Sequence, residues 1–502
     1  MPTNSTYFNI CINDRSNQIV ANNGVVIEGQ MLRIGTAIPD KLVRLKDKSL
    51  IDEMFGQGSI IGESLKIAFE EPTSVDIYAL PRMDVKNGVK SQYTLTFRGS
   101  ATRNEPLRIF AGNKPYEIMV DIYKGEDASS IAKKVAEFVL PTFPFDVEYK
   151  DNKVIFTAKN AGEVGNVLCP LKEWEQFMGV YNTGVAVNLT HDIIGSNDPV
   201  YDYGNIFGDC SYYAHILCSP NITWQYNLQK YLEAKWDCTK GAFRGGHGYV
   251  YNVGDLQTIL ETGTNAAVLS RLACHKDSHV FPYLKNTSFG ILSANQGQSL
   301  QTVPIAVEGD NYGVLTAISS PTNCSGLWSQ ADIEKLTDEG FVVAEPNTYS
   351  GSGYASPVVR RDITNFLRDE TGSGNYTYRM ASTSRILFEL VNIIEDFLTP
   401  KIATPVYTNG TTIPINTQGT TPAMLQGELI AYLRTYTGRL LSNITFDNAE
   451  DNIRVIMEQD INGLCKGDPD KVIIFLRLYL PNNIDKFEIN IDPRLNRCGR
   501  GV

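Results

Sequence analysis

Apolar and polar residues alternate in two short segments near the ends of the chain, at residues 7–13 and 486–491. Period-2 alternation predicts half-buried strands. A lone strand at a terminus needs an edge to pair with, and a neighbouring subunit can supply one. We therefore predict terminal arms that link copies of this chain. The apolar positions of these arms are Phe8, Ile10 and Ile12 at one end, and Phe487, Ile489 and Ile491 at the other.

Residues 25–85 alternate between predicted strands and helices. Ser49 is the expected N-cap of a helix over 50–55, and a second helix over 60–70 stops before Pro72. The predicted strands are 25–27, 31–37 and 75–80. Residues 91–168 instead carry short alternating strands and one helix over 128–140, which predicts an inserted β-rich module. The α/β alternation returns over 185–345 and favours a mostly parallel sheet.

The C-terminal region contains two long segments with helical periodicity, over 379–398 and 424–441. An exposed loop, 404–421, is expected between them, and strands are expected at 452–459 and 471–479. The apolar stripe of the first helix is Ile386, Leu390, Ile393 and Phe397, and that of the second is Leu425, Leu429 and Leu433.

A chain of 502 residues is too long for one hydrophobic core, so several domains are expected. The predicted fold class is α/β and α+β multidomain: an α/β core with an inserted small β-rich domain, and a C-terminal α+β domain with terminal strand arms. The expected boundaries are an N-terminal arm at 1–24, an α/β domain at 25–90 and 185–350, the insertion at 91–184, the C-terminal domain at 351–480 and a C-terminal arm at 481–502.

Composition excludes several classes of function. No Lys/Arg cluster is longer than a pair and the net charge is −11, so nucleic-acid binding is not expected. No apolar run approaches the roughly 20 residues of a membrane span, so no membrane insertion is expected. The nine cysteines are scattered, and their odd count with no signal peptide indicates free thiols in a reducing cytosol. Cys11 and Cys498 lie near the two arms, where an intermolecular cross-link is conceivable.

Three features resemble chemical sites, and each has a simpler structural interpretation that we favour. Gly56, Gly58 and Gly62 have the wrong spacing for a phosphate loop and follow a helix, which favours a loop with a helix cap. His275 and His279, beside Cys274, would share one helix face as metal ligands do, but no glutamate stands between them as in HExxH. The loop 244–248, Arg-Gly-Gly-His-Gly, is a tight connection or a binding loop at a strand end. We expect no catalytic, cofactor or metal site.

The chain resembles the contractile tail sheath proteins of bacteriophages, closest to the Mu-like branch. A strand at 31–37 followed by Met-Phe-Gly-Gln-Gly-Ser at 54–59, and the strand at 75–81, are similar to the opening of that family. Residues 97–101, 107–112 and 156–166 are similar to its inserted segments. Residues 361–369 and 375–378 resemble the stretch before the long helix of its conserved C-terminal sheath domain. The chain departs from the family in its short N-terminus.

The resemblance implies a structural virion protein, not an enzyme, without cofactors. It implies hexameric rings stacked helically around a tail tube, in which terminal arms of neighbours add strands to the C-terminal domain's sheet. Contraction would drive the tube through the host envelope for genome ejection. The implied partners are further copies of the chain, the tail tube protein, and baseplate and tail terminator proteins, assembled in the host cytoplasm. On the family precedent, Arg385 and Arg434 are candidate tube-facing residues. The alternatives are the sheath of a pyocin-like or type VI injection machine, or an α/β enzyme with an inserted domain.

Overall fold

The computed structural model describes most of the chain between residues 21 and 476. The described ranges are 21–71, 74–110, 117–168, 184–199, 203–208, 210–236, 245–276, 281–295, 305–306, 328–346, 357–359, 361–368, 371–374, 378–402, 404–414, 418–438, 440–441, 453–457 and 472–476.

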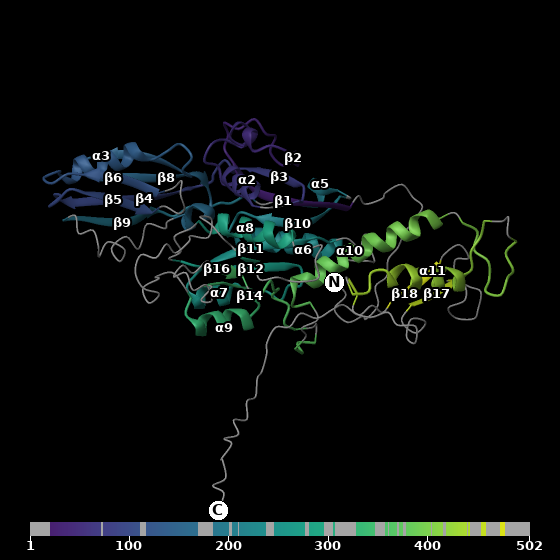
Figure 1. Cartoon of the computed structure of the whole chain (residues 1–502). Helices are drawn as coiled ribbons and strands as arrows, with labels where there is room; N and C mark the ends of the chain where they lie inside the picture. The colour runs from purple at the N-terminus through teal and green to yellow at the C-terminus, as the bar shows by residue number, and fades with distance from the viewer. Residues whose placement is uncertain are drawn as a thin grey trace, which may run out of the picture.

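The central sheet of the described chain has seven strands in the order β14-β12-β11-β10-β1-β3-β2 (Figure 1). All neighbours are parallel except β2, which runs antiparallel to β3. Burial on both faces explains the near-continuous apolar runs in these strands. The mixed α/β architecture expected from the sequence is thus observed. The strands are β1 Ala21–Met31, β2 Val43–Leu45, β3 Ile77–Met83, β10 Ser211–Leu217, β11 His247–Gly254, β12 Leu269–His275 and β14 Phe341–Val342.

Helices cover both faces of this sheet. Tyr249 packs its ring against Phe289 of α8, whereas a Cβ on the preceding Gly248 would meet Leu228 and Leu232 of α6, so α8 and α6 lie on opposite faces. Helix α2 packs beside α8. The helices of this part are α1 Ile51–Phe55, α2 Ile60–Glu70, α5 Gly204–Phe207, α6 Ile222–Lys235, α7 Leu256–Glu261, α8 Pro282–Asn295 and α9 Gln330–Asp338, and a 3₁₀ turn, Lys48–Leu50, precedes α1.

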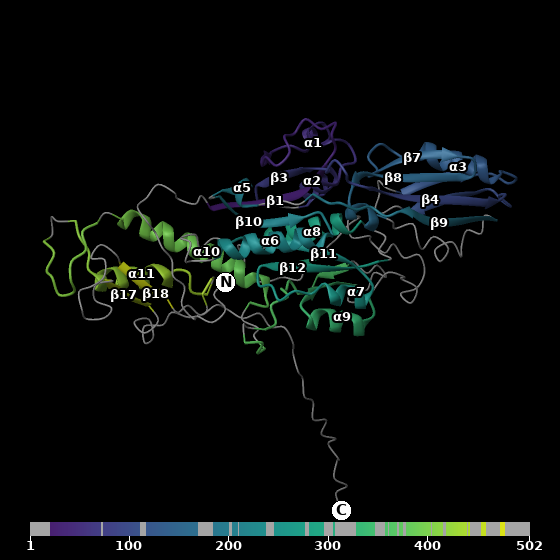
Figure 2. The same ribbon diagram turned by 180° about the vertical axis from the view of Figure 1, so that it is seen from behind.

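A four-stranded antiparallel sheet, in the order β7-β8-β4-β9, lies at one end of the molecule (Figures 1 and 2). Helix α3 packs on it and on the hairpin β5–β6. Strand β9 pairs with β4 although it lies beyond residue 184. The elements are β4 Lys90–Gly99, β5 Glu105–Phe110, β6 Glu117–Ile122, α3 Ala128–Phe138, β7 Phe145–Lys150, β8 Lys153–Ala161, a 3₁₀ turn Glu163–Val167, and β9 Val185–Ile193.

This small sheet docks on the carboxyl ends of the central strands, beside β1, where the winding of the large sheet changes direction. Gln30 donates to Ala161 O at 2.7 Å and to Asp84 at 2.8 Å, and Asn160 donates to Met31 O at 3.1 Å. The carboxyl group of Asp84 lies at this junction, and its burial there raises its pKa. Open α/β sheets bind ligands at such a switch point. In this chain, the end of β8 occupies that position.

The C-terminal part lies at the other end of the molecule (Figures 1 and 2). Helix α10 runs from the central body to a unit that contains α11 and the two-stranded antiparallel sheet β17–β18. Its elements are α10 Ala381–Leu398, a 3₁₀ turn Thr399–Lys401, α11 Pro422–Arg434, β17 Ile453–Met457 and β18 Val472–Leu476. A three-stranded sheet, β13-β16-β15, consists of Ile305–Ala306, Pro357–Val359 and Ala344–Pro346.

Several expected elements differ from the structure. Only Met31 of the predicted strand 31–37 is in a strand, because the chain then folds back beside α1, where Gly35 lies too close to the backbone of Met54 for a side chain. Asp47, not Ser49, caps the turn before α1. The helix predicted over 424–441 ends at Arg434. Gly438 follows with a φ of 80°, a conformation that glycine adopts without strain.

Candidate assembly site: the C-terminal hairpin and its anchor on the body

The predicted arms, with Phe8, Ile10 and Ile12 and with Phe487, Ile489 and Ile491, lie outside the described residues, as do Cys11 and Cys498. The described structure does contain a small sheet whose edges can receive such arms. That sheet is the pair β17–β18, with Val455 opposite Ile474 in the register.

One edge of this pair is covered and the other is open within the described chain. The N–H of Val455 donates to Gln426 Oε1 of α11 at 3.3 Å, so it points away from β18. In an antiparallel ladder, the opposite residue of such a pair also turns its N–H and C=O outward. Ile474, and Val472 and Leu476 with the same parity, therefore present their backbone polar groups along the outer edge of β18. No described residue pairs with that edge.

A separate apolar cluster supports the hairpin. Ile453 and Leu476 are buried against Leu429 and Leu433 of α11 and against residues of α10. Phe397 stacks on Tyr432 with ring centroids 4.9 Å apart. A two-stranded sheet is marginal in isolation, and packing on helices gives it the apolar burial that it lacks. The hairpin is thereby held as a platform with one exposed edge.

Helix α10 belongs to two cores at once. Leu387, Phe388 and Val391 are buried in the cluster of the central body, and Phe388 meets Tyr213 of β10 edge to face at 5.4 Å. The stripe predicted from the sequence faces the C-terminal cluster instead, where Ile386, Leu390 and Ile393 are buried and Phe397 packs at the margin. The helix thus connects the hairpin to the body through two different apolar faces.

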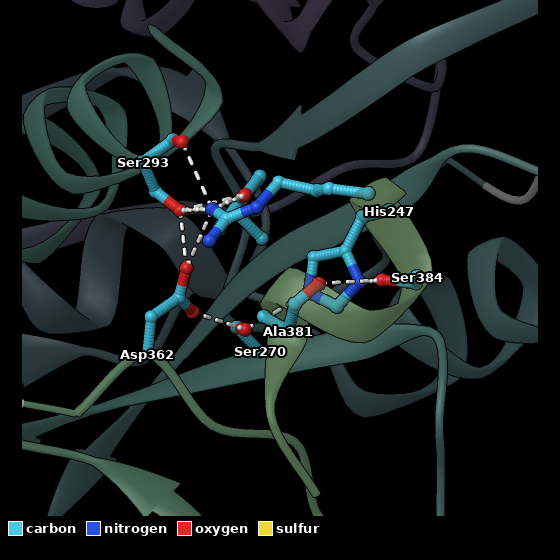
Figure 3. Close-up of polar contacts among 8 residues, drawn as sticks. His247, Ser270, Ser293, Asp362, Ala381 and Ser384 are labelled. Atoms are coloured by element: carbon cyan, nitrogen blue, oxygen red, sulfur yellow. Dashed lines mark hydrogen bonds and ion pairs between the residues drawn. The ribbon is translucent and has the colours of Figure 1, made fainter. Parts of the chain in front are cut away.

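The first turns of α10 are also fixed by a buried ion pair (Figure 3). Arg385 Nη1 lies 2.8 Å from Asp362 Oδ2, and both side chains are only 3% exposed. The same nitrogen donates to Ser293 O of α8 at 2.9 Å and reaches Tyr249 Oη at 3.4 Å. Ser293 also donates to Asp362. Removing one partner of such a pair leaves a buried charge without compensation, which is costly.

A chain of hydrogen bonds closes the network back onto α10 (Figure 3). Ser270 of β12 donates to Asp362 Oδ1 at 2.8 Å, and His247 of β11 contacts Ser270 at 2.9 Å through Nε2 and Ser384 at 2.9 Å through Nδ1. Since Ser270 gives its single proton to Asp362, we assign the proton of a neutral His247 to Nε2, which donates to Ser270. The single proton of Ser384 has two acceptors within reach, Ala381 O at 2.8 Å and His247 Nδ1 at 2.9 Å. The donors Ser270 and His247 thus both point toward the carboxylate.

Neither predicted tube-facing arginine stands on an open surface. Arg385 is buried in this conformation, where its charge pairs with Asp362, and its tube-facing role stays a prediction. Arg434 lies half-buried in the last turn of α11, and its role stays a prediction. Sequence periodicity missed this distinction, since Arg385 lies next to Ile386 on a helix that packs on both sides.

Acid should loosen the anchor of α10. Burial lowers the pKa of His247 to about 4, with Asp362 raising and Arg385 lowering it further, while its ordinary value is 6.5. Below pH 6.5 the unfolded chain therefore binds more protons than the folded chain. The stability that neutral His247 contributes is complete above pH 6.5 and is lost as the pH falls toward 4. We expect about 2 kcal/mol less stability at pH 5 than at pH 7 from this group. Chemical denaturation of the wild type and of H247Q at both pH values measures it.

Burial also lowers the pKa of His215, to about 3, so a second histidine contributes to the pH dependence of stability. H247Q should therefore flatten only part of the pH dependence. If the stability of H247Q changed with pH as that of the wild type does, His247 would not be a source of the pH dependence.

The other sequence candidates are structural in the described chain. His275 ends strand β12 and meets Trp328 edge to face at 4.7 Å, so the helix spacing assumed for a metal pair does not apply; His279 lies outside the described residues. No described group of three His, Cys, Asp or Glu residues is placed to hold a metal ion. Gly56 and Gly58 adopt positive φ before Ser59, whose side chain caps α2 as expected. Of the loop 244–248, His247 and Gly248 open β11, and Arg244 is not described.

No model of a known protein family matches the chain. None of the helices in the described ranges has the length and apolarity required to cross a membrane. Three solved structures align along most of the chain, with TM-scores of 0.43 to 0.46 and 11–12% identity.

Two of these structures are sheath tail proteins. The one from Desulfitobacterium hafniense covers 89% of this chain and 93% of its own, and the one from Listeria innocua covers 91% and 92%. The third is described as the anti-feeding prophage baseplate in the contracted state and covers 99% of both chains.

A curated relative is the Mu-like prophage FluMu tail sheath protein of Haemophilus influenzae. It is 22% identical over 461 residues, which are 88% of this chain and 88% of that protein. This match along both chains confirms the resemblance drawn from the sequence: the chain is similar to the tail sheath protein of a Mu-like prophage over most of its length.

Proposed function

We propose that the chain is a structural subunit of a contractile tail sheath, and that the β18 edge receives a terminal arm of a neighbouring copy. The open edge of β18 carries this proposal, together with the sequence match to a tail sheath protein. The alternating segments 7–13 and 486–491, which the sequence predicts to be strands, have a suitable length for a five-residue edge such as Val472–Leu476. An added strand supplies main-chain hydrogen bonds, and its apolar side chains cover the sheet.

Strand addition by arms would become strong when many copies are linked. Each main-chain hydrogen bond contributes roughly 0.5–1.5 kcal/mol net, so one arm is modest and a mesh of arms is strong. Stacked hexameric rings around a tail tube satisfy every arm except those at the ends. Helix α10 then carries each joint on a rigid support, since it is buried in both the body and the C-terminal unit.

Contraction would be a mechanical step of this assembly. The energy comes from subunit surface buried in the contracted state, at about 25 cal/mol per Å² of apolar area. Baseplate proteins trigger it, and the tail tube and terminator proteins are further partners. The particle is a virion tail assembled in the host cytoplasm, and the subunit is neither an enzyme nor a nucleic-acid-binding protein.

The domain boundaries follow from the same interpretation. We place an N-terminal arm at 1–24, the α/β domain at 25–90 with its second part up to 350, the C-terminal sheath domain at 351–480 and a C-terminal arm at 481–502. The pairing of β9 with β4 favours extending the insertion from 91–184 to about Ile193. The insertion projects outward as decoration.

Two alternatives remain open to test. A non-phage contractile injection machine would use the same subunit chemistry, and the genes beside this one distinguish it from a phage. An α/β enzyme would show saturable turnover and would keep its activity without its termini. The end of β8 at the switch point of the central sheet favours the structural role.

Removing either arm should abolish polymerisation without unfolding the chain. Variants lacking residues 1–14 or 484–502 keep every described element, so a folded monomer is expected. Negative-stain electron microscopy of the purified full-length protein should show hollow tubes or stacked rings, and neither truncation should form them. Tubes of normal length from one truncation would exclude that arm as a linker. A full-length protein that stays monomeric at high concentration would overturn the proposal.

A further inference from the structure

The β2 edge of the central sheet presents exposed isoleucines and unpaired cations. Ile34 is 77% exposed, Ile38 is 60% exposed and Leu50 is 49% exposed. This surface, which we call the basic rim, has the exposed acids Asp40 and Asp76, which pair with Arg82 and Arg44, and the exposed acids Asp47 and Glu53. Its exposed cations besides Arg44 are Arg33, Lys41, Lys46 and Lys48. None of these four cations forms an ion pair with a described residue, whereas the neighbouring Arg44 is paired with Asp76 at 2.7 Å.

The rim is a fixed surface. The N–H groups of Leu32, Thr36 and Ala37 donate to the carbonyls of Phe55, Glu53 and Met54 at 2.9–3.1 Å, so the loop is held along α1. Large apolar side chains that a fixed loop holds exposed indicate a surface for contact with another molecule.

The opposite edge of the same sheet carries the opposite charge. Helices α7 and α9 pack together there beside β14, over Ile259, Leu336 and Phe341. Half-buried Leu256 and Leu260 lie among the carboxylates of this surface. We call it the acidic face; its exposed acids are Asp255, Glu261, Glu334, Asp338 and Glu339, with Lys276 and Lys335 as the exposed cations.

The two surfaces cannot meet within one chain. β2 and β14 are the two ends of the seven-stranded order, and they lie at opposite sides of the sheet in Figure 1. Six strand spacings of about 4.8 Å separate them by roughly 29 Å. A contact between two different surfaces of identical copies repeats head to tail and builds rings or helices.

We propose that the basic rim of one copy docks on the acidic face of the next copy. The inference rests on the proposed function only in that copies assemble, and it adds a lateral contact separate from strand addition at β18. Attraction between the charges sets the register, while Ile34 and Ile38 supply apolar area against the leucines of α7. In a chain with a net charge of −11, the cations of the rim offset repulsion where copies approach.

Charge reversal in the full-length protein tests this contact. We expect K46E/K48E on the rim, and separately E334K/E339K on the acidic face, to raise the critical concentration for tube assembly by about tenfold at low salt, because like charges then face each other. The quadruple variant should restore assembly to within about threefold of the wild type. K133E/K150E, on the inserted domain, controls for the change in net charge. Light scattering with electron microscopy measures all of them.

The quadruple variant distinguishes a contact between the two surfaces from independent effects at each surface. Rescue in the quadruple variant supports the contact. Losses that simply add in the quadruple variant, or single-surface variants that assemble like the control, overturn it while leaving the arm-based proposal intact. A rim variant that alone impairs assembly, with no effect from the acidic face, would assign the rim to a different partner protein and overturn the self-contact. Failure of the wild type to assemble would overturn both proposals.

Discussion

Replacing Ile474 by proline should abolish tube assembly while the monomer stays folded. Proline removes the N–H of residue 474, which points away from β17, so the hydrogen bonds between β17 and β18 remain. An incoming arm strand loses one of its few main-chain partners and meets the proline ring at the edge. We expect the critical concentration to rise by at least about tenfold, since a five-residue edge offers few hydrogen bonds to lose. Electron microscopy and light scattering measure the assembly, and circular dichroism measures the fold.

The matched control is V455P on the other edge of the same pair. It removes the N–H that donates to Gln426, so it changes the covered edge and should leave assembly at β18 in place. If V455P blocked tube formation and I474P did not, the arm would dock beside β17. If neither did, strand addition at this hairpin would be wrong.

Helix boundaries and the buried stripe of a helix were predictable from the sequence where a capping residue, a proline or a simple periodicity determines them. Helix α2 has the predicted bounds, because Ser59 caps its start and Pro72 follows its end. Asn221 and Asp255 cap α6 and α7, and both residue types are typical of N-caps. The stripe of α10 was also correct, since Ile386 and Leu390 are buried where helical spacing places them.

Long-range features could not be predicted in this way. The second buried face of α10 uses Leu387 and Phe388, which periodicity assigns to the opposite side of a one-sided helix. The partners of Arg385 come from positions as distant as Ser293 and Tyr249 in the sequence, so no local signal pairs them. The open edge of β18 depends on which N–H groups turn outward, and a single contact from Gln426 reveals that.

Breaking the buried ion pair should detach α10 from the body. In R385M, Asp362 keeps only its two serine donors, Ser270 and Ser293, so its charge stays buried without a counterion. Loss of one partner from such a pair costs about 3–5 kcal/mol. Because the other face of α10 packs on the hairpin unit, the expected result is local opening at the first turns of the helix while the C-terminal cluster stays intact. Hydrogen exchange along α10 and chemical denaturation measure the two effects.

Two comparisons separate the pair from general damage. R379M removes a nearby arginine that lies 4.0 Å from the exposed Asp338 and donates to Thr337 O at 3.0 Å, so a smaller loss, of about 2 kcal/mol, is expected. The double variant R385M/D362L replaces both charges with apolar groups and should recover much of the lost stability, since a buried pair costs desolvation on both sides. Equal losses in R385M and R379M would show that the ion pair does not anchor the helix. A double variant no better than R385M would place the cost in packing around Tyr249 and Ser293, where the guanidinium contacts both residues. Recovery, with slow exchange restored in the first turns of α10, would establish that the anchor acts through charge compensation and that the hairpin platform is held to the body by it.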